Sequence, residues 1–458
     1  MTRWYGIPPR SERALRWAAG SALIAVLATV LGAGAAQAQA LSFDDARVLL
    51  MNSSDKRKAA EANLTRQELE VKTVETLRYP DVTLNATQVY GRKNFDLSAL
   101  PIGIDAYDYN FDGPRSSVLV NWPLYTGGKI EAAQKLREAE RSGAEAELQQ
   151  TEEQLDFQLI VRYFGLRLAK MVEALRTDQL EQADRQVARA RRFEALGQIA
   201  AVERLSAQVA RDEAARDLIK AQRERESAAA GLMRLLRESR PPQPTTPLFV
   251  ITTPLAPLEV WLRDAETRSP VLALLRSKRA AAEQGVTAAR ADYLPQVFAF
   301  GQYNFITRYL TPIEPNWIAG IGVNIKLFSR EDRASRLGAA ESQTTQVRAL
   351  EAETLNTILD AVETAWLRLA QAREQFKLFD SSLALARENL RLRERAFEEG
   401  QSVSIDVNEA RNSLIRAETG RAQVAYEFVV ALGALLEASG QIGRFSDLMQ
   451  RADVHLQP

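Results

Sequence analysis

The sequence predicts a mostly helical chain with a membrane β-barrel portion, built as two tandem repeats of helix, two strands, long helix and helix. Three observations predict this fold. The chain repeats itself with a period of about 200 residues, two long proline-free stretches carry apolar residues at every seventh position, and four segments of about ten residues are rich in aromatic, β-branched and Gly residues. Because membrane barrels start at about eight strands, four strands cannot close one, and several chains must pool their strands.

The N-terminus of the 458-residue chain has the pattern of a secretory signal peptide. A basic start precedes a small, apolar run at 18–36, and AQAQA at 36–40 offers two overlapping A-x-A cleavage sites. We expect residues 1–40 to be removed, so that the mature chain begins at Leu41, or at Gln39 if the earlier site is cut. The alternative is that the apolar run persists as a membrane anchor. No later segment approaches the roughly 20 apolar residues of a transmembrane helix.

The internal repeat is visible as paired motifs. VNWPLY at 120–125 matches VNIKLF at 323–328, and the same offset of 203 residues relates Gly197 to Gly400. A period of this length is too long for a solenoid unit and indicates a duplicated half-molecule. We expect a first repeat at 41–240, a proline-rich linker at 241–257, a second repeat at 258–440 and a C-terminal tail at 441–458.

Each repeat is expected to contain one long helix. There is no proline from 331 to 397, and at 1.5 Å per residue a helix of this length would form a rod of roughly 100 Å. The first repeat has a similar stretch from 129 to about 192. Shorter helices are expected at 56–78, 202–237, 271–292 and 403–437, and in each repeat the two short lengths sum to nearly the long one. The apolar positions with seven-residue spacing in the second repeat are Leu355, Val362, Leu369, Phe376, Leu383 and Leu390.

Four strands are expected at 81–90, 116–125, 296–305 and 317–327. Ten residues is the length of a tilted strand that crosses a bilayer. The alternative for each segment taken alone is an ordinary soluble β-sheet. The connections at 91–115 and 306–316 should both be cell-surface loops, because the opposite strand ends lead into helices.

The composition excludes several classes of function. Lys+Arg and Asp+Glu both number 59, so the net charge is zero and gives no sign of nucleic-acid binding. The absence of Cys excludes disulfides, thiolate metal sites and lipidation. The single His, His455, lies near the end of the chain and is expected to be a bystander. No nucleophile, metal-binding or phosphate-binding motif is present, so we expect no enzyme activity, no catalytic residues, no metal and no cofactor.

Together with the duplicated plan across 41–440, two further features resemble the TolC-like family of outer-membrane efflux and secretion channels. One is the pair of turns that join each long helix to its return, RRFEALGQIAAVERLSAQ at 191–208 and FEEGQSVSIDVNEARNSL at 397–414. The other is the strand-to-helix corner NWPLYTGGK at 121–129, with Pro123, Gly127 and Gly128 at the family's motif positions. The second repeat has VNIKLFSRED at 323–332, a degenerate corner that lacks those glycines.

The resemblance implies a homotrimer, in which three chains supply twelve strands to one barrel in outer-membrane lipid. Twelve helices would continue this barrel as an α-helical tunnel through the periplasm. It further implies a periplasmic adaptor (membrane fusion) protein and an inner-membrane transporter or ABC exporter as partners. The chain would then be the passive exit duct of a tripartite efflux pump or type I secretion system, with energy supplied by the inner-membrane pump.

The resemblance also implies a gate at the periplasmic entrance. The family's acidic ring corresponds to Asp406 and Glu409, and its latch includes an acid that corresponds to Glu203. This chain departs from the family at two latch positions, where Phe397 replaces a Tyr and Ser402 replaces an Arg. The alternative is that these acids are ordinary solvated helix charges. The turns at Gly197 and Gly400 would form the helix tips, and a substitute latch could use Arg191, Arg192 or Arg395 with Glu398 or Glu399.

Two other classes of protein share part of this pattern. A periplasmic coiled-coil adaptor or scaffold protein would explain the heptads and the signal peptide, but it would not explain four strands placed symmetrically in two repeats. An exported enzyme would need a cluster of acid, base, nucleophile or metal ligands, and the sequence shows no such cluster.

Overall fold

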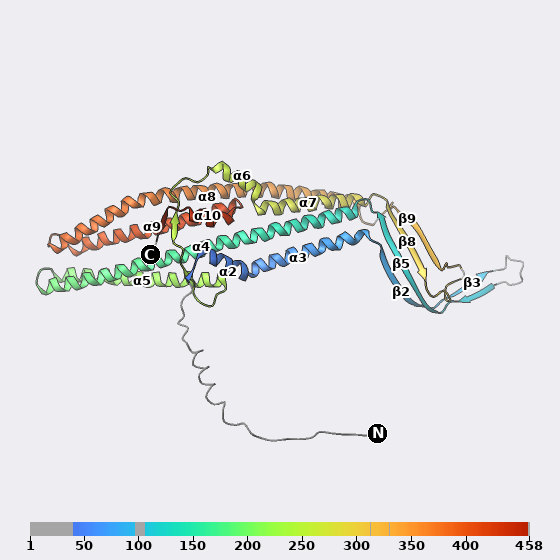
Figure 1. The fold of residues 1–458 in the computed structure, drawn as a ribbon, viewed down its shortest axis with the longest axis horizontal. Helices are drawn as coiled ribbons and strands as arrows, with labels where there is room; N and C mark the ends of the chain where they lie inside the picture. The colour runs from blue at the N-terminus through green and yellow to red at the C-terminus, as the bar shows by residue number, and fades with distance from the viewer. Residues whose placement is uncertain (1–39, 97–105, 312, 329, 457–458) are drawn as a thin grey trace, which may run out of the picture.

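The computed structural model describes residues 40–96, 106–311, 313–328 and 330–456, and Figure 1 shows an elongated molecule. Helices run side by side along the long axis, and a sheet leaves one end of the helical part at an angle. The expected signal peptide at 1–40 lies outside the described residues, except for Ala40.

Two long helices confirm the expected rods, α4 at Lys129–Ala195 and α8 at Arg333–Glu398. Four shorter helices flank them: α3 at Asp55–Glu75, α5 at Ala201–Leu236, α7 at Pro270–Ala291 and α9 at Ser404–Ala438. Helices α3 and α5 pack along α4, and α7 and α9 pack along α8. Because α4 also contacts α7 and α9, the two repeats form one body. Among the described helices, none is both long and apolar enough to cross a membrane.

The heptad pattern of the long helices defines their buried sides. Val362 and Phe376 of α8 are almost fully buried, and Leu159 and Leu166 of α4 are also fully buried. Charged residues occupy much of the remaining surface and form many ion pairs between turns of one helix, such as that between Arg141 and Glu145. An apolar seam with a charged remainder suits long helices that pack side by side at shallow angles.

Four strands form one antiparallel sheet: β2 at Asp81–Val89, β5 at Gly113–Tyr125, β8 at Gln296–Asn304 and β9 at Trp317–Asn324. They lie in the order in which the chain makes them, so β2 and β9 are the edges. Neither edge strand has a second strand partner among the described residues. Since neighbouring strands alternate in direction, β2 and β9 run in opposite directions.

One face of this sheet is mostly apolar, and its polar members Ser116 and Gln88 lie toward the strand ends remote from the helices. Residues directly opposite one another on paired strands share a face, and the register links Val120 to Val82 and Gly301, and Gly301 to Ala319. Large side chains on this face are exposed in the single chain, Ile321 by 71%. The residues of this apolar face are Val82, Leu84 and Ala86, Val118, Val120 and Trp122, Val297, Ala299, Gly301 and Tyr303, and Trp317, Ala319, Ile321 and Val323.

The opposite face, here called the polar face, is dominated by polar and small residues. Two phenyl rings on it, Phe298 and Phe300, lie over Gly322 and Gly320, and a Cβ at Gly322 would come within 2.5 Å of the Phe298 ring. The division into an apolar and a polar face is that of a membrane barrel. The polar groups of this face belong to Asp81, Thr83, Asn85 and Thr87, Arg115, Ser117 and Asn121, Gln296, Gln302 and Asn304, and Asn324.

Beyond the sheet, the connection between β2 and β5 contains a hairpin of β3 at Arg92–Asp96 and β4 at Ala106–Asn110. The sequence predicts only a loop at 91–115, and β5 begins earlier than expected, at Gly113. An ion pair between Arg92 and Asp108 crosses this hairpin. The alternating polar and aromatic residues of this hairpin favour strands, but each strand has only five residues, which is too short a pattern to predict from the sequence.

The middle of the helical part holds a core that the sequence pattern did not predict. The linker and the C-terminal tail are ordered here, because both contribute short strands. In the linker, β6 at Gln243–Pro244 pairs with β1 at Ala40–Leu41, and β7 at Leu248–Val250 pairs with β10 of the tail at Val454–Leu456. The short elements around them are α2 at Phe43–Ser53, α6 at Leu258–Arg268 and α10 at Phe445–Gln450, with 3-10 turns at Ile442–Arg444 here and at Thr76–Arg78 before β2.

Aromatic side chains fill this central core. The rings of Phe43, Phe164 and Phe445 lie within 6.0 Å of one another, centroid to centroid. The buried Tyr163 hydroxyl donates to the Leu41 carbonyl at 2.7 Å and accepts the backbone N–H groups of residues 245 and 246. One hydroxyl thus fastens residue 41 and the linker at 241–257 to α4. His455 lies on β10 with an exposed side chain.

Candidate functional site

The two helical hairpins, α4–α5 and α8–α9, end in equivalent turns at the end of the molecule farthest from the sheet (Figure 1). Gly197 closes the first turn with φ 73°, and Gly400 closes the second with φ 71°. In the first turn the Gln198 N–H donates to the Phe193 carbonyl at 2.8 Å. This is the Schellman closure of a helix C-terminus, which needs a left-handed residue that glycine adopts without strain.

The acids singled out by the resemblance lie just after these turns. Glu203 is the third residue of α5, and Asp406 is the third residue of α9. A carboxylate in the first turn is stabilised by the unpaired N–H groups and the helix dipole. Glu409 lies three residues after Asp406 on the same side of α9. Both acids of α9 line a cavity of about 490 Å³ that they share with Arg393 and Arg416.

Glu203 connects the two hairpins. Its Oε2 accepts the backbone N–H of Ser404 at 3.0 Å, and Ser404 is the fully buried first residue of α9. A side chain of the first repeat therefore caps a helix of the second repeat, satisfying an amide that has no partner within its own helix. A second contact between the hairpins joins Arg189 to Glu398 at 3.4 Å.

Asp406 has two partners on its own hairpin. The Ser402 hydroxyl donates to its Oδ2 at 2.8 Å, and Arg393 lies 3.5 Å from the same oxygen. Ser402, at the position of the family's Arg, therefore still contacts an acid, but as a neutral donor within one chain. Glu409 forms no hydrogen bond or ion pair within the part of the chain that the structure describes, so its charge is open to solvent or to another chain.

Phe397 is buried and packs against Phe193 of the other hairpin, with ring centroids 6.1 Å apart. At this position Phe397 makes an apolar contact, whereas the family's Tyr would provide a hydroxyl for hydrogen bonding. The sequence offers three arginines for a substitute latch, Arg191, Arg192 and Arg395. None of the three forms an ion pair with a described residue, and the cation that the structure places against Glu398 is Arg189.

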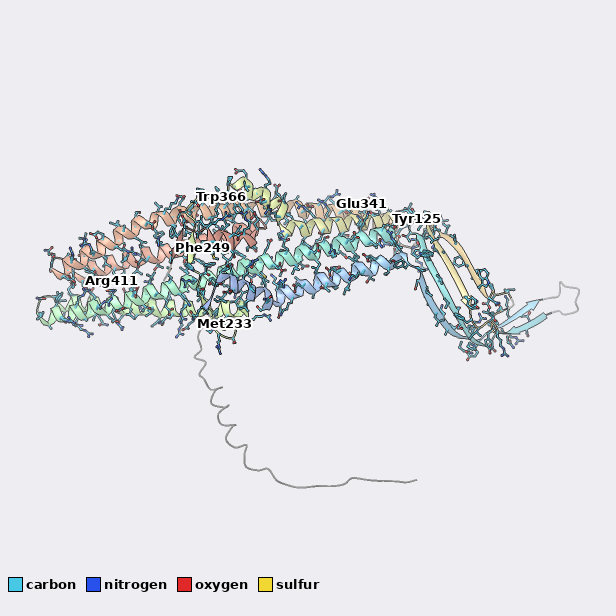
Figure 2. All side chains as sticks on the ribbon, in the orientation of Figure 1. Tyr125, Met233, Phe249, Glu341, Trp366 and Arg411 are labelled. Carbon is cyan, nitrogen blue, oxygen red and sulfur yellow. The ribbon has the colours of Figure 1, made fainter. Side chains whose placement is uncertain are left out.

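Sequence reasoning missed Arg411, the most buried cation near the tips (Figure 2). It is 5% exposed and pairs with Glu394 at 2.7 Å. Burial lowers the pKa of this guanidinium, the Glu394 carboxylate opposes that shift, and nearby Arg189 and Arg185 add to it. The one hint of this burial in the sequence is that Arg411 directly follows Ala410, a small residue on the buried side of α9. Loss of Glu394 would leave the buried Arg411 without a counter-charge and facing two further cations, which would favour separation of the hairpins.

At the other end of the helices, the first corner turns sharply from β5 into α4, near Tyr125 in Figure 2. The strand register shifts between Pro123 and Tyr125, as expected where proline cannot donate to the ladder. Gly127 and Gly128 have φ of 67° and 89°. A Cβ at Gly127 would lie 2.8 Å from the Cβ of Leu294, so this corner requires glycine.

The second corner, which lacks glycines, is held by an arginine. Arg333 donates to the carbonyls of Lys326 at 2.8 Å and Asp292 at 3.2 Å, and its guanidinium lies 4.8 Å from the centre of the Tyr293 ring. The nearly buried Asp292 carboxylate also pairs with Lys129 at 3.1 Å, at the start of α4. One acid therefore links the corners of both repeats, which fixes the sheet on the helices.

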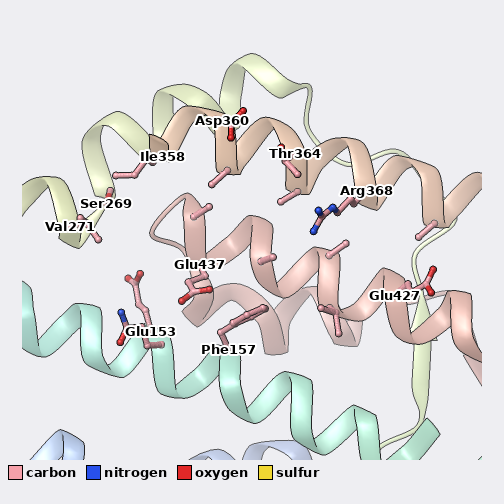
Figure 3. A pocket seen from close by; sticks show the side chains of 18 of the residues that line it. Glu153, Phe157, Ser269, Val271, Ile358, Asp360, Thr364, Arg368, Glu427 and Glu437 are labelled. Atoms are coloured by element: carbon pink, nitrogen blue, oxygen red, sulfur yellow. The ribbon is translucent and has the colours of Figure 1, made fainter. Parts of the chain in front are cut away.

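A larger cavity of about 790 Å³ lies between α4, α8 and α9, and several of its lining residues belong to the central core. Glu153 and Glu437 point toward one another in it (Figure 3). Burial raises the pKa of each carboxyl to about 7, and the charge of Glu437 adds to the shift at Glu153. The other charged groups of the cavity are Asp360, Arg368 and Glu427.

Comparison with known proteins identifies the family. The sequence model of the family described as "Outer membrane efflux protein" matches residues 49–237 and 261–441. The chain is 24% identical over 397 residues to Protein CyaE of Bordetella pertussis, covering 84% of this chain and 80% of that protein. It is 23% identical over 360 residues to the outer membrane efflux protein BepC of Brucella suis, covering 78% and 77%.

Solved structures agree on the fold. The outer-membrane channel OprN superposes with a TM-score of 0.72 over 87% of this chain and 90% of that chain, at 20% sequence identity. At this identity the likeness shows the fold, and it matches the long helices and short strands described above.

The contact between the hairpins predicts the effect of Glu203→Ala. Loss of the cap should cost about 1 kcal/mol and speed amide hydrogen exchange in the first turn of α9 by about fivefold. Glu203→Gln keeps an acceptor and should have a smaller effect, while Glu224→Ala, at an exposed site on α5, should have none. Unchanged exchange at residues 404–406 in Glu203→Ala would show that the carboxylate does not hold the tips together.

The buried carboxyl pair predicts a pH dependence of stability. Both pKa values rise from 4.5 to about 7 on folding, so the folded chain keeps protons that the unfolded chain has lost, and stability falls as pH rises through this interval. The double variant Glu153→Gln with Glu437→Gln should lose this part of the pH dependence and unfold at a higher temperature at pH 8. Glu353→Gln, at an exposed site on α8, is the control. A double variant with the parent's pH profile would contradict the assignment.

Proposed function

Because the chain belongs to the outer membrane efflux protein family, it is an outer-membrane efflux or secretion channel, and we propose that three copies of it assemble into one duct. Members of this family are transport proteins and not enzymes. The chain would supply a passive path, and transport energy would come from a pump in the inner membrane.

The four-stranded sheet is the observation that carries this proposal. Its apolar face is exposed in the single chain, and its two edges have no strand partner among the described residues. Lipid suits such a face, and a bilayer tolerates strands only when every edge is paired. Since β2 and β9 run in opposite directions, β9 of one copy can continue the antiparallel order onto β2 of the next. Three copies would give twelve strands, an even number within the known range of membrane barrels.

The helices continue the same arrangement away from the membrane. Near the sheet, α3, α4, α7 and α8 lie in the order of the strands to which they connect. Three copies would therefore place twelve helices around one axis, as a periplasmic tunnel. A coiled-coil adaptor or scaffold would have no use for the exposed apolar sheet face, which disfavours that alternative.

The partners follow from the same role. A duct without an energy source needs an inner-membrane transporter or ABC exporter, and a periplasmic adaptor protein to join the two. The relatives' names describe an efflux protein in BepC and an outer-membrane channel in OprN. We extend that role to this chain in either a tripartite efflux pump or a type I secretion system.

We place the gate of this duct at the hairpin tips. Asp406 and Glu409 of three copies would bring six carboxylates around one entrance. Two like charges ~4 Å apart repel by about 1 kcal/mol even in bulk water, so a closed ring should attract multivalent cations. Glu203 and Phe397 would hold the tips of one chain together, through the Ser404 amide and the Phe193 ring.

The acidic ring is tested by conductance of the purified protein in planar bilayers with hexaamminecobalt(III) as the blocking cation. Asp406→Ala with Glu409→Ala should assemble normally and lose the block, because the charges that bind the cation are gone. Glu224→Ala with Glu226→Ala removes the same charge from an exposed part of α5 and should leave the block unchanged. A double tip variant that is blocked as well as the parent would refute the ring. A parent protein that forms no conducting pores would refute the duct itself.

A further inference from the structure

A buried glutamine of α4 faces the second hairpin without a hydrogen-bond partner. Gln186 is 1% exposed, and neither its side-chain oxygen nor its side-chain nitrogen is bonded to a described residue. Gln179, seven residues earlier, donates to Asn412 of α9 at 3.3 Å, and Phe193, seven residues later, packs against Phe397 of α8. Because seven residues are nearly two turns of an α-helix, these three residues of α4 lie along one line, and Gln186 faces the α8–α9 hairpin.

The contact between the two hairpins near their turns, here called the tip seam, also contains an unpaired polar group from α9. The Ser404 hydroxyl is fully buried and has no hydrogen-bond partner in the described part of the chain, although the backbone N–H of the same residue is bonded. Arg411 of α9 is 5% exposed and lies close enough to Arg185 and Arg189, which flank Gln186 on α4, for their charges to oppose its own. Both hairpins therefore place polar groups in the tip seam, where a well-packed pair of helices would have apolar side chains.

A buried amide without a partner destabilises the arrangement that buries it. In water the oxygen and nitrogen of a glutamine side chain are hydrogen-bonded, and burial without replacement bonds loses that free energy. Separation of the hairpins would let water reach Gln186 and would restore those bonds. The contacts between the hairpins, among them the cap that Glu203 provides, act in the opposite direction. A small difference in free energy then decides whether the tip seam is closed or open.

We propose that Gln186 is a positioning residue of the gate, because its unpaired amide lowers the free energy needed to separate the hairpins. The proposal rests on the gate placed at the hairpin tips above. Its role differs from that of Asp406 and Glu409, whose charges attract cations, since Gln186 sets how readily the tips part. An apolar side chain of similar size at this position would keep the tip seam closed for longer.

Thiol labelling of the purified full chain in detergent tests this proposal. The chain has no native Cys, so Ser404→Cys places a single thiol of nearly the same size in the tip seam, where a maleimide reacts when the hairpins separate. In that background Gln186→Leu should slow labelling by about fivefold or more, because the buried unpaired amide is gone. Gln186→Asn keeps an amide at this position and should label at least as fast as the parent.

Gln179→Leu is the matched control. It replaces the same residue type on the same line of α4, at a position where Arg176 and Asn412 already bond the amide. This variant should label as fast as the parent or faster, and Gln346→Leu, at an exposed site on α8, should label at the parent's rate. Parent-like labelling of Gln186→Leu, or equal slowing in Gln179→Leu, would overturn the role of the unpaired amide.

Single-channel recording in planar bilayers separates this proposal from the duct. Gln186→Leu should spend about fivefold less time in the open state than the parent, for the same reason as above. Slowed labelling with unchanged open times would overturn the link between the tip seam and the gate, while the duct would stand. If the parent forms no conducting pores, the duct is refuted, and the labelling rates still decide whether Gln186 favours separation of the hairpins.

Discussion

The edges of the four-stranded sheet, which have no strand partner within the described part of the chain, constrain the rest of this structure. In hydrocarbon every backbone N–H and C=O needs a partner, and each orphan costs several kcal/mol. One chain cannot meet this requirement, because β2 and β9 lie three strand spacings apart, roughly 14 Å. The apolar face that these strands share is equally unsuited to water. The trimer that we propose would meet this requirement, and the duct would be a consequence of that assembly.

The corners, the central core and the helix tips keep the helices in the order that the sheet sets. At the corners, Gly127 and Gly128 allow β5 to turn into α4, and Asp292 fastens that turn to the second repeat. The order of strands thereby becomes the order of helices. Farther along, the aromatic core around Tyr163 holds the linker that joins the repeats. At the tips the hairpins meet again through several contacts, among them the hydrogen bond from the Ser404 amide to Glu203.

Much of this architecture could be predicted from the sequence, because long periodic patterns carry it. The rods, the four strands and the two glycine turns follow from spacing, and their bounds agree closely with expectation. The central core could not be predicted, since its strands are two or three residues long and gain their stability from tertiary contacts. The same holds for single side chains. That Glu203 reaches the Ser404 amide, or that Arg115 lies beneath Glu314, depends on how two distant segments meet, which no local pattern records.

Cross-linking of the sheet edges tests the central claim most directly. The chain has no native Cys, so Thr83→Cys on β2 and Ile318→Cys on β9 would provide the only thiols, both on the polar face. Within one chain they are too far apart for a disulfide, which needs Cα atoms about 4.4–6.8 Å apart. Cysteine pairs at neighbouring positions on the same face would be tested as well, because the register between β9 of one copy and β2 of the next is not fixed by the single chain. The account predicts that oxidation in native membranes gives covalent dimers and trimers and nothing larger, because three copies close the ring. Cross-linked species that end at two chains, extend beyond three or never form would contradict it.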